Sequence, residues 1–299
     1  MLKQQQSTLV PAGAAAPGRV FRALNYTLFI FLTLICVLPY VHLIAKALSS
    51  NTAVVSGFVS FWPVEFQLDV FGYVLRNGMF WQAFGNSVFV TAVGTLISIT
   101  VTVLAAYPLS KPDFRGRKCI LLLYVFSMLF YGGTVPIYIL MQALGLINSL
   151  WSIIIPFTVS QFNLFVMKTF FEGIPESIEE SARIDGAKHL RILTSIILPL
   201  SLPSVATIGL FYAVNYWNGY YHAMLFITKP SVKPLQLYLY ELISTASKIR
   251  ELEPDQAMNL SSVGVQAASI VLGTLPILLS YPFAQRYFIH GLTIGSVKG

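Results

Sequence analysis

Residues 179–199 read EESARIDGAKHLRILTSIILP, and they place a concentrated run of polar side chains inside a largely apolar chain. Acidic residues crowd the first half, where carboxylates interact favourably with the positive end of a helix dipole. Pro175, just upstream, suits the first turn of a helix, and Gly186 can take the left-handed conformation that ends one. Lys188 opens a second apolar and basic run. The stretch therefore predicts a short helix, a turn and a second helix.

Long stretches without a charged residue occupy most of the rest of the chain. The 299 residues are 56% hydrophobic and 10% charged, whereas about a quarter of the residues of a soluble domain are charged. A membrane span needs about 20 apolar residues, and the longest charge-free stretch, 119–167, holds two around the turn formers of 145–149. The fold class predicted is an all-α membrane protein with six spans, at about 21–45, 84–107, 119–142, 150–171, 203–227 and 263–285.

The charges outside these spans predict an orientation. If both termini are cytoplasmic, the cytoplasmic segments carry 13 Lys/Arg and six acids, and the outer loops carry six of each; the cytoplasmic segments are 1–22, 108–118, 168–191 and 286–299. The whole formal net charge of +7 then lies on the cytoplasmic side, in agreement with the positive-inside rule. Because the basic residues flank spans and form no soluble patch, nucleic-acid binding is disfavoured. Residues 1–20 have the composition of a flexible tail.

Residue types needed for catalysis or metal binding do not converge anywhere in the sequence. The four histidines are scattered and no H-E-x-x-H or Cys/His cluster occurs, so no catalytic residue and no metal site are predicted. The two cysteines, Cys36 and Cys119, lie in or beside spans and predict no disulfide. The spans contain no carboxylate, although ion-coupled carriers usually have one there. No G-x-x-x-x-G-K-[ST] phosphate loop occurs, so any ATP that drives transport must act on another polypeptide.

Two interpretations are open for the polar stretch of residues 179–199. It can dock such an ATPase, with Ser181 and Ala182 small enough to let a partner's walls come close and with acids that pair with basic groups at the rim. It can equally be a solvated loop with good helix caps, because Ser177-Ile-Glu-Glu180 fits a capping box. Local composition does not separate the two interpretations.

A family resemblance favours docking. The pattern E-x-A-x3-G-x9-I-x-L-P, present from Glu180 to Pro199, resembles the EAA loop of ABC importer permeases, with Ser181 where that family often has Ala. Further residues resemble its carbohydrate-uptake branch, which contains the smaller maltose permease subunit and also permits an oligosaccharide or polygalacturonan permease: Asn86-Ser87, Ile174-Pro175, Trp217-Asn218 and the terminal GLTIGSVKG. The resemblance covers about residues 20–299.

The resemblance implies the type I importer permease fold in a bacterial cell membrane, working by alternating access. The implied partners are a second, different permease subunit, two cytoplasmic ATPases and an extracellular solute-binding protein, and the implied substrate is a carbohydrate. ATP and Mg²⁺ then bind to the ATPases, and this chain holds no cofactor and is not an enzyme. The coupling loop is 173–200, and its residues assigned to ATPase coupling are Glu179, Glu180, Ser181, Ala182, Asp185, Gly186 and Ala187.

The same resemblance assigns a second ATPase contact to the C-terminal tail, 286–299. In the related maltose system the smaller permease's C-terminus reaches the interface between the ATPases. The residues here that correspond to this contact are His290, Gly291, Lys298 and Gly299.

Polar and aromatic side chains in the fourth and fifth spans are candidates for the sugar path. Aromatic faces with a few placed polar groups suit a sugar cavity, and amides in a membrane helix normally face the protein interior. Hydrogen bonding and packing between helices is the stronger interpretation of these amides. The candidates are Gln161, Asn163, Asn215, Trp217, Asn218 and Tyr220.

The outer segments 46–82 and 228–262 are predicted to contact the binding protein, although solvated loops explain them equally well. PLQLYLYELI at 234–243 predicts an amphipathic helix on the membrane or under a partner. Small residues such as Gly94 and Gly273 indicate close helix packing. The alternative functions are a permease for a non-sugar solute in the same importer class and, less favoured, a stand-alone secondary carrier.

Overall fold

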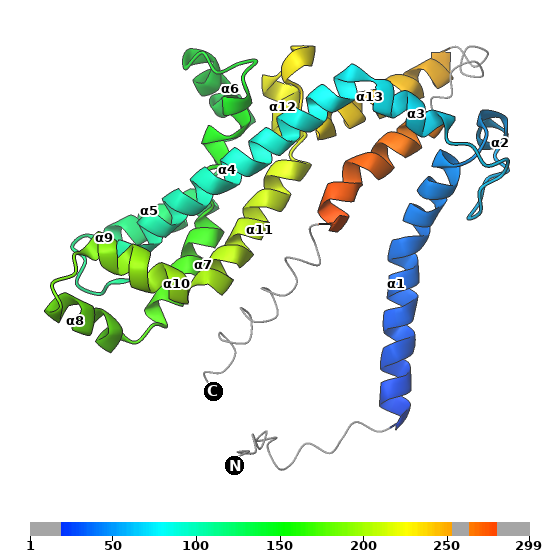
Figure 1. The fold of residues 1–299 in the computed structure, drawn as a ribbon. Helices are drawn as coiled ribbons and strands as arrows, with labels where there is room; N and C mark the ends of the chain where they lie inside the picture. Colours follow the sequence, from blue (N-terminus) through cyan, green and yellow to red (C-terminus); the bar gives the residue numbers. More distant parts are fainter. Residues whose placement is uncertain (1–18, 253–262, 280–299) are drawn as a thin grey trace.

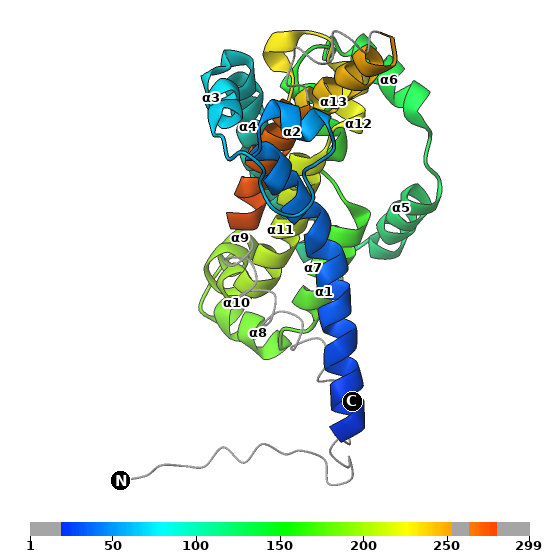
Figure 2. The ribbon, with the colours of Figure 1, turned by 90° about the vertical axis from the view of Figure 1, so that its right-hand side faces the viewer.

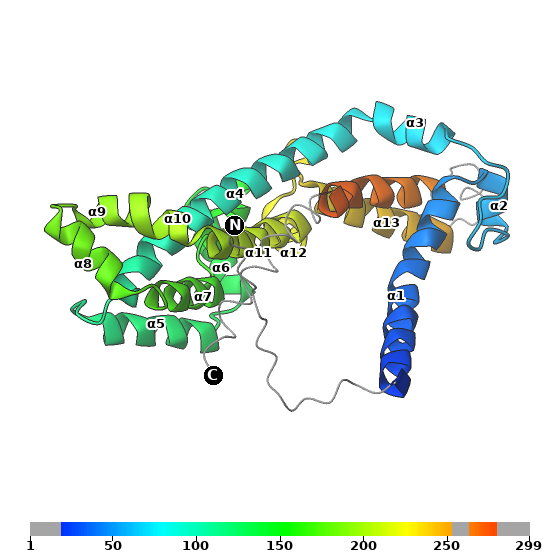
Figure 3. The ribbon, with the colours of Figure 1, turned by 60° about the horizontal axis from the view of Figure 1, so that its bottom comes forward.

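The computed structural model describes residues 19–252 and 263–279, and this part of the chain consists of helices joined by turns and loops, without a strand. The predicted all-α class is therefore confirmed for the described residues. Three helices form the centre and pack against one another: α4 (Gly78–Ser110), α7 (Gln161–Glu172) and α11 (Leu202–Asn218). Helix α1 (Arg19–Ala47) stands apart from this bundle along most of its length (Figures 1 and 3).

Two helices, α1 and α4, are each long and apolar enough to cross a membrane. Three further segments reach that length only as bent pairs: α5 (Arg117–Leu129) with α6 (Thr134–Ala143) at 112°, 150–157 with α7 at 47°, and His189–Leu200 with α11 at 84°. The last described helix, Val263–Leu279, is apolar but shorter. The described residues thus contain two to five segments that can span, and the six-span count stays a prediction.

Helices α5 and α6 form an arm at the side of the bundle. Helix α5 contacts α7, α6 contacts α12 (Tyr221–Phe226), and the connection between α5 and α6 bows outward (Figure 2). No residue of α5 is buried. Leu122 and Phe126 are among its exposed apolar side chains.

The segment 150–171, predicted from charge spacing as one span, is not a single helix. Two 3-10 turns, η1 (Leu150–Ile153) and η2 (Ile155–Phe157), precede α7, and Pro156 lies in the second turn. Proline lacks a backbone N–H and cannot continue an α-helical ladder. A break of this kind leaves backbone groups that need other partners in an apolar environment.

Two tyrosines of α11 supply partners at this break. Tyr216 donates its hydroxyl to the carbonyl of Ile154 at 3.2 Å, and the hydroxyl of Tyr212 accepts from the backbone N–H of Ser160 at 3.0 Å. Both tyrosines are buried. The break is therefore held in a defined geometry by α11.

The contact between α4 and α11 is close because α4 presents small residues to it. A Cβ added at Gly94 would lie 2.8 Å from the ring of Tyr216, closer than packed carbon atoms come. Ser98 and Thr102, on the following turns of α4, hydrogen bond with Tyr216 and Tyr212 at 3.0 and 2.8 Å. The packing role predicted for the small residues of this span is confirmed at Gly94.

Helix α13 (Leu235–Leu252) follows η4 (Pro230–Val232) at the end of the bundle near α3 (Asp69–Arg76). It contains nearly all of the residues predicted to form an amphipathic helix at 234–243. Its placement corrects the expectation that it lies on the membrane or under a partner. Leu235, Leu237 and Leu239 are buried within the chain, because α13 packs on α4 and on the 263–279 helix.

Asn86 and Ser87 of α4 fix the start of α13. The amide of Asn86 donates to the carbonyls of Ser231 and Lys233, both at 3.0 Å. The buried hydroxyl of Ser87 accepts from the backbone N–H of Leu235 at 2.8 Å. The pair therefore satisfies backbone groups that η4 and the start of α13 leave unpaired.

Candidate coupling site

The polar stretch forms α8 (Glu176–Ile184), a tight turn and α9 (His189–Ile192), at the opposite end of α4 from α3 (Figures 1 and 3). Gly186 has φ +79°, so it adopts the left-handed conformation predicted for it. The backbone N–H of Ala187 closes the turn onto the carbonyl of Ala182 at 2.9 Å. The predicted helix, turn and second helix are confirmed.

The predicted capping box is wrong. Helix α8 begins at Glu176, directly after Pro175, and no side chain caps its first turn. The ring of Pro175 restricts its backbone to φ −57°, and the helix starts at Glu176, two residues earlier than it would with Ser177 as the cap. Ser177 lies exposed inside the helix, and Glu180 is exposed as well.

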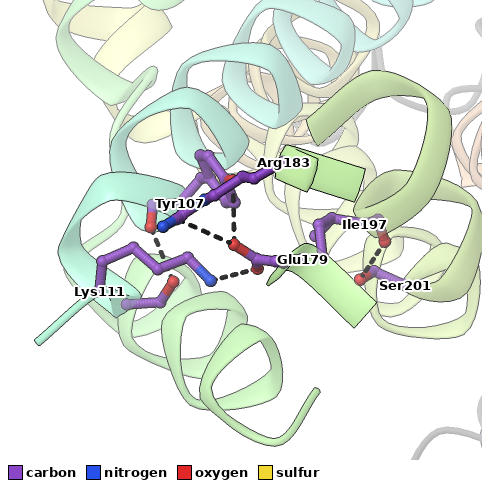
Figure 4. A network of polar contacts seen from close by, with 7 residues as sticks. Tyr107, Lys111, Glu179, Arg183, Ile197 and Ser201 are labelled. Carbon is purple, nitrogen blue, oxygen red and sulfur yellow. Dashed lines mark hydrogen bonds and ion pairs between the residues drawn. The ribbon is translucent and has the colours of Figure 1, made fainter. Parts of the chain in front are cut away.

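Glu179 lies on the inner face of α8 and is 2% exposed. Its carboxylate accepts a hydrogen bond from Lys111, directly after α4, and another from the hydroxyl of Tyr107 at 3.3 Å (Figure 4). Arg183, one turn along α8, is 3.7 Å away. A buried carboxylate is tolerated only when it is paired and hydrogen bonded. Glu179 therefore links α8 to the end of α4.

An apolar cluster continues this inner face. Ala182 is 7% exposed and lies with Met167 and Phe171 of α7, and with side chains of α4 and of the segment after α9. Two expectations are thereby corrected. The small size of Ala182 serves packing within the chain, and Glu179 is not free to pair with basic groups on a partner. The apolar residues of the segment after α9 that join the cluster are Ile192, Leu193 and Ile197.

The outer face carries the groups that remain accessible. Glu180, Ser181, Asp185 and Gly186 are exposed. Two large apolar side chains flank the turn, Ile184 at 86% and Leu190 at 68% exposed; sequence reasoning missed both. No local signal marked their exposure, because the sequence does not show which face of α8 or of α9 the bundle covers.

A π-helical turn, η3 (Leu193–Ile197), joins α9 to α10 (Leu198–Leu200) and then to α11. The carbonyl of Ile197 accepts two hydrogen bonds from Ser201, one from its hydroxyl at 2.7 Å and one from its backbone N–H at 3.0 Å (Figure 4). The chain then bends by 84° into α11. The outer face of α8 and α9 is thus connected to the central bundle both through Glu179 and through this corner.

Residues 98–294 match the family described as binding-protein-dependent transport system inner membrane component. The chain belongs to this family. The permease is 40% identical to the polygalacturonan/rhamnogalacturonan transport system permease protein YtcP of Bacillus subtilis (strain 168), over 94% of this chain and 99% of the relative. It is 39% identical to protein LplC of the same organism, over 94% and 96%.

A solved structure is similar along nearly the whole permease. It is a crystal structure of a bacterial ABC transporter involved in the import of the acidic polysaccharide alginate, with a TM-score of 0.82 and 34% sequence identity over 90% of this chain and 97% of that chain. These similarities confirm the resemblance to ABC importer permeases.

The candidate sugar-path residues of the permease are not gathered into one cavity. Asn215 lines a hollow of about 80 Å³ together with Phe157 and His222. Sites for small ligands usually measure about 300–1,000 Å³, so this hollow alone does not hold a sugar. Trp217 lies elsewhere, buried against Phe84, and its indole N–H has no hydrogen-bond partner within the described part of the chain.

The remaining candidates divide between packing and exposure. Gln161 donates to the hydroxyl of Ser127 at 3.3 Å, which ties α7 to α5, and Asn163 is buried at the start of α7. Asn218 is exposed, and Tyr220 stacks on Tyr240 at 5.1 Å between ring centroids. Their roles in the sugar path stay predictions. The tail residues His290, Gly291, Lys298 and Gly299 lie outside the described residues.

Proposed function

We propose that this permease forms one half of the translocation path of an oligosaccharide importer and that a separate ATPase docks on α8 and α9. The observation that carries the proposal is the division of this segment into two faces. Glu179 and Ala182 fasten the inner face to α4 and α7, and the outer face exposes Ile184 and Leu190 beside Glu180. Large apolar side chains held together on a rigid surface mark a protein contact.

The proposed orientation puts α8, α9 and both termini in the cytoplasm of a bacterial cell with six membrane spans. The charge distribution supports it, because the net charge of +7 then lies on the side where α8 and α9 are. ATP and Mg²⁺ are proposed to bind only to the partner ATPase. Motion of that ATPase then reaches the bundle through Glu179 and through the corner at Ser201.

A second permease subunit is proposed to complete the path. The hollow beside Asn215 is too small for a sugar, so residues of another chain are needed to line a larger cavity around it. Helix α5 has no buried residue, and α1 has only Ala45 and Ala47, which leaves two apolar helices with surface for such a subunit.

The proposed substrate is an oligosaccharide that contains uronate units. YtcP is named for polygalacturonan and rhamnogalacturonan, and the similar solved transporter imports alginate, an acidic polysaccharide. The test is the ATPase rate of the complete transporter in proteoliposomes with its binding protein and either oligogalacturonate, oligoalginate or neutral maltodextrin. Stimulation by the acidic sugars is expected. Stimulation by maltodextrin alone would contradict the uronate class, and none by any sugar would contradict carbohydrate import.

The docking proposal is tested by exchanging the exposed apolar residues at the turn. Ile184→Ser and Leu190→Ser each remove an apolar side chain that docking would bury, which is worth about 1.5–3 kcal/mol. Each variant is expected to bind the ATPase roughly 10- to 100-fold more weakly, measured by titrating labelled ATPase onto the purified permease pair in nanodiscs.

Leu200→Ser is the matched control, because Leu200 is 51% exposed on α10 and away from the turn. It is expected to bind the ATPase as the unmodified chain does. All three residues are exposed, so folding stability should change by no more than about 0.5 kcal/mol. Equal affinity in all four proteins would refute docking at the turn of α8 and α9.

A further inference from the structure

The loop between α2 (Asn51–Val55) and α3 carries a group of highly exposed aromatic side chains. Phe58, Trp62 and Phe66 are 75%, 83% and 63% exposed. Residues 57–66, here called the aromatic loop, precede the region that matches the family and take no part in the coupling site. Aromatic side chains exposed to this degree need an explanation, because water is an unfavourable environment for them.

The aromatic loop is held in place from within the chain. Val59 is 4% exposed and packs with Ala45 of α1 and with Ala53 and Val54 of α2. The backbone N–H of Phe58 also donates to the carbonyl of Ala53 at 3.1 Å. The loop therefore presents its exposed rings from a fixed support.

Its second half is tied to the residues that follow α1. The N–H of Val64 donates to the hydroxyl of Ser49 at 3.0 Å, and the N–H of Ser50 donates to the carbonyl of Val64 at 3.1 Å. The N–H of Gln67 donates to the carbonyl of Leu48 at 3.0 Å. These bonds place residues 64–67 beside the end of α1.

The tip of the loop lies farther back along α1. The ring N–H of His42 donates to the carbonyl of Ser60 at 2.5 Å, and the ring of Phe61 lies edge-on to His42 at 6.4 Å. His42 precedes Ala47, the last residue of α1, by five positions, which corresponds to about 7 Å along the helix axis. Figure 1 shows the loop turning back beside α1 in this way.

Charged and aromatic side chains of this region lie at different positions along the axis of α1. Glu65 accepts a hydrogen bond from the hydroxyl of Ser50 at 2.6 Å, beyond the end of α1, and Lys46 lies in the last turn of that helix. The exposed Trp62 follows the tip residues that contact His42. Glu65 and Lys46 thus lie where α1 ends, and the tip residues Ser60 and Phe61, which precede Trp62, lie beside His42, five residues earlier on the helix.

We infer that the aromatic loop is an interfacial anchor, whose tip lies among the phospholipid headgroups and first acyl carbons of the leaflet at the C-terminal end of α1. Trp side chains are favoured at this depth, and charged groups remain in the water-facing layer above it. A protein arriving from the aqueous side would meet the exposed Glu65 first, whereas the tip at Ser60 and Phe61 lies farther back along α1. The anchor fixes the depth and tilt of α1.

The inference rests on the proposed membrane placement of α1 and not on its orientation. It is tested by nitroxide labels on the complete transporter in phosphatidylcholine nanodiscs, with power saturation by oxygen, which partitions into lipid, and by a water-soluble nickel chelate. The labelled positions are Ser60→Cys at the tip and Gln67→Cys beside Leu48, both with Cys36 and Cys119 replaced by Ser. Both Ser60 and Gln67 are exposed, so the labels should not disturb packing.

The expected result is a Ser60→Cys label more accessible to oxygen than to the chelate, and roughly 7 Å deeper than the Gln67→Cys label. A Ser60→Cys label open to the chelate would place the tip in water and overturn the inference. A label shielded from both reagents would place it under another protein chain, which overturns the inference as well.

A label on native Cys36, in the middle of α1 and exposed there, separates failure of this inference from failure of the membrane placement. With Cys119 replaced by Ser, the Cys36 label should be accessible to oxygen and shielded from the chelate. If it is open to the chelate, α1 itself is not in lipid. If it is in lipid and only the Ser60→Cys label is in water, the anchor alone is refuted.

Discussion

At the scale of the residue, the two adjacent glutamates of α8 have different environments. Successive residues of a helix are separated by about 100° around its axis, so Glu179 faces α4 while Glu180 faces away. Glu179 is 2% exposed and bonded to Lys111 and Tyr107, whereas Glu180 is exposed. One acid thus stabilises the position of the coupling segment, and the other is available to a partner.

Glu179→Ala and Glu180→Ala should therefore produce different defects. Glu179→Ala removes hydrogen bonds to a charged group and leaves Lys111 without its partner, so the free energy of unfolding should fall by about 1–3 kcal/mol. Glu180→Ala should change it by less than about 0.5 kcal/mol yet lower ATP-driven uptake. Thermal unfolding in one detergent and uptake into proteoliposomes measure the two effects. Equal losses of stability in both variants would contradict the assignment of faces.

The sequence pattern identified this site but not the roles of its residues. The turn at Gly186 was predictable, since a left-handed residue at a helix end favours glycine. The inward direction of Glu179 was not, because it depends on Lys111 and Tyr107, which are about 70 positions earlier in the chain. The exposure of Ile184 on α8 and of Leu190 on α9 depends in the same way on which face of each helix the bundle covers.

At the scale of the element, the α4–α11 contact depends on a glycine that only the packing explains. A Cβ at Gly94 would lie 2.8 Å from the ring of Tyr216, whereas a Cβ at Gly85 of the same helix would meet nothing within 4 Å. The same substitution therefore has opposite consequences at the two positions.

Gly94→Ala should lower the free energy of unfolding by about 1–3 kcal/mol, because Tyr216 must move and its hydrogen bonds weaken. Gly85→Ala should raise it by up to about 1 kcal/mol, since alanine is the better helix former in an open position. Thermal unfolding of the two variants in the same detergent gives both values. A destabilised Gly85→Ala together with an unaffected Gly94→Ala would contradict the packing described here.

The helices themselves were predictable from charge spacing to differing extents. Helices α1 and α4 are continuous apolar elements, and the long stretches without a charged residue predicted both of them directly. The break at 150–160 was not predicted, although Pro156 is a local signal for it. Its geometry was not predictable locally, because it depends on Tyr212 and Tyr216 of α11, which are distant in sequence.

At the scale of the whole molecule, the coupling segment and the aromatic loop lie at opposite ends of the chain's helices (Figure 3). The charge rule predicts that α8 faces the cytoplasm and that the loop faces outward. Asp185→Cys and Gln67→Cys, each with Cys36 and Cys119 replaced by Ser, put one exposed thiol at each end.

A membrane-impermeant maleimide should label Gln67→Cys in intact cells and Asp185→Cys only in inverted vesicles. The expected difference in labelling is at least about tenfold, since an intact bilayer excludes a charged reagent. Labelling of both positions from the same side would contradict the proposed topology. Labelling of Asp185→Cys in intact cells, and of Gln67→Cys only in inverted vesicles, would show that the orientation is reversed.

Helix α4 has one further consequence for how the two ends of the molecule behave. It is unbroken over 33 residues, with Asn86 attached to the start of α13 and Tyr107 attached to α8. These attachments are 21 residues apart, or about 32 Å. A stiff rod pivoting by 10° about its midpoint moves such points by about 3 Å in opposite directions. One rigid rotation of α4 then opens the molecule at one end and closes it at the other, so the two events need no separate conformational change between them.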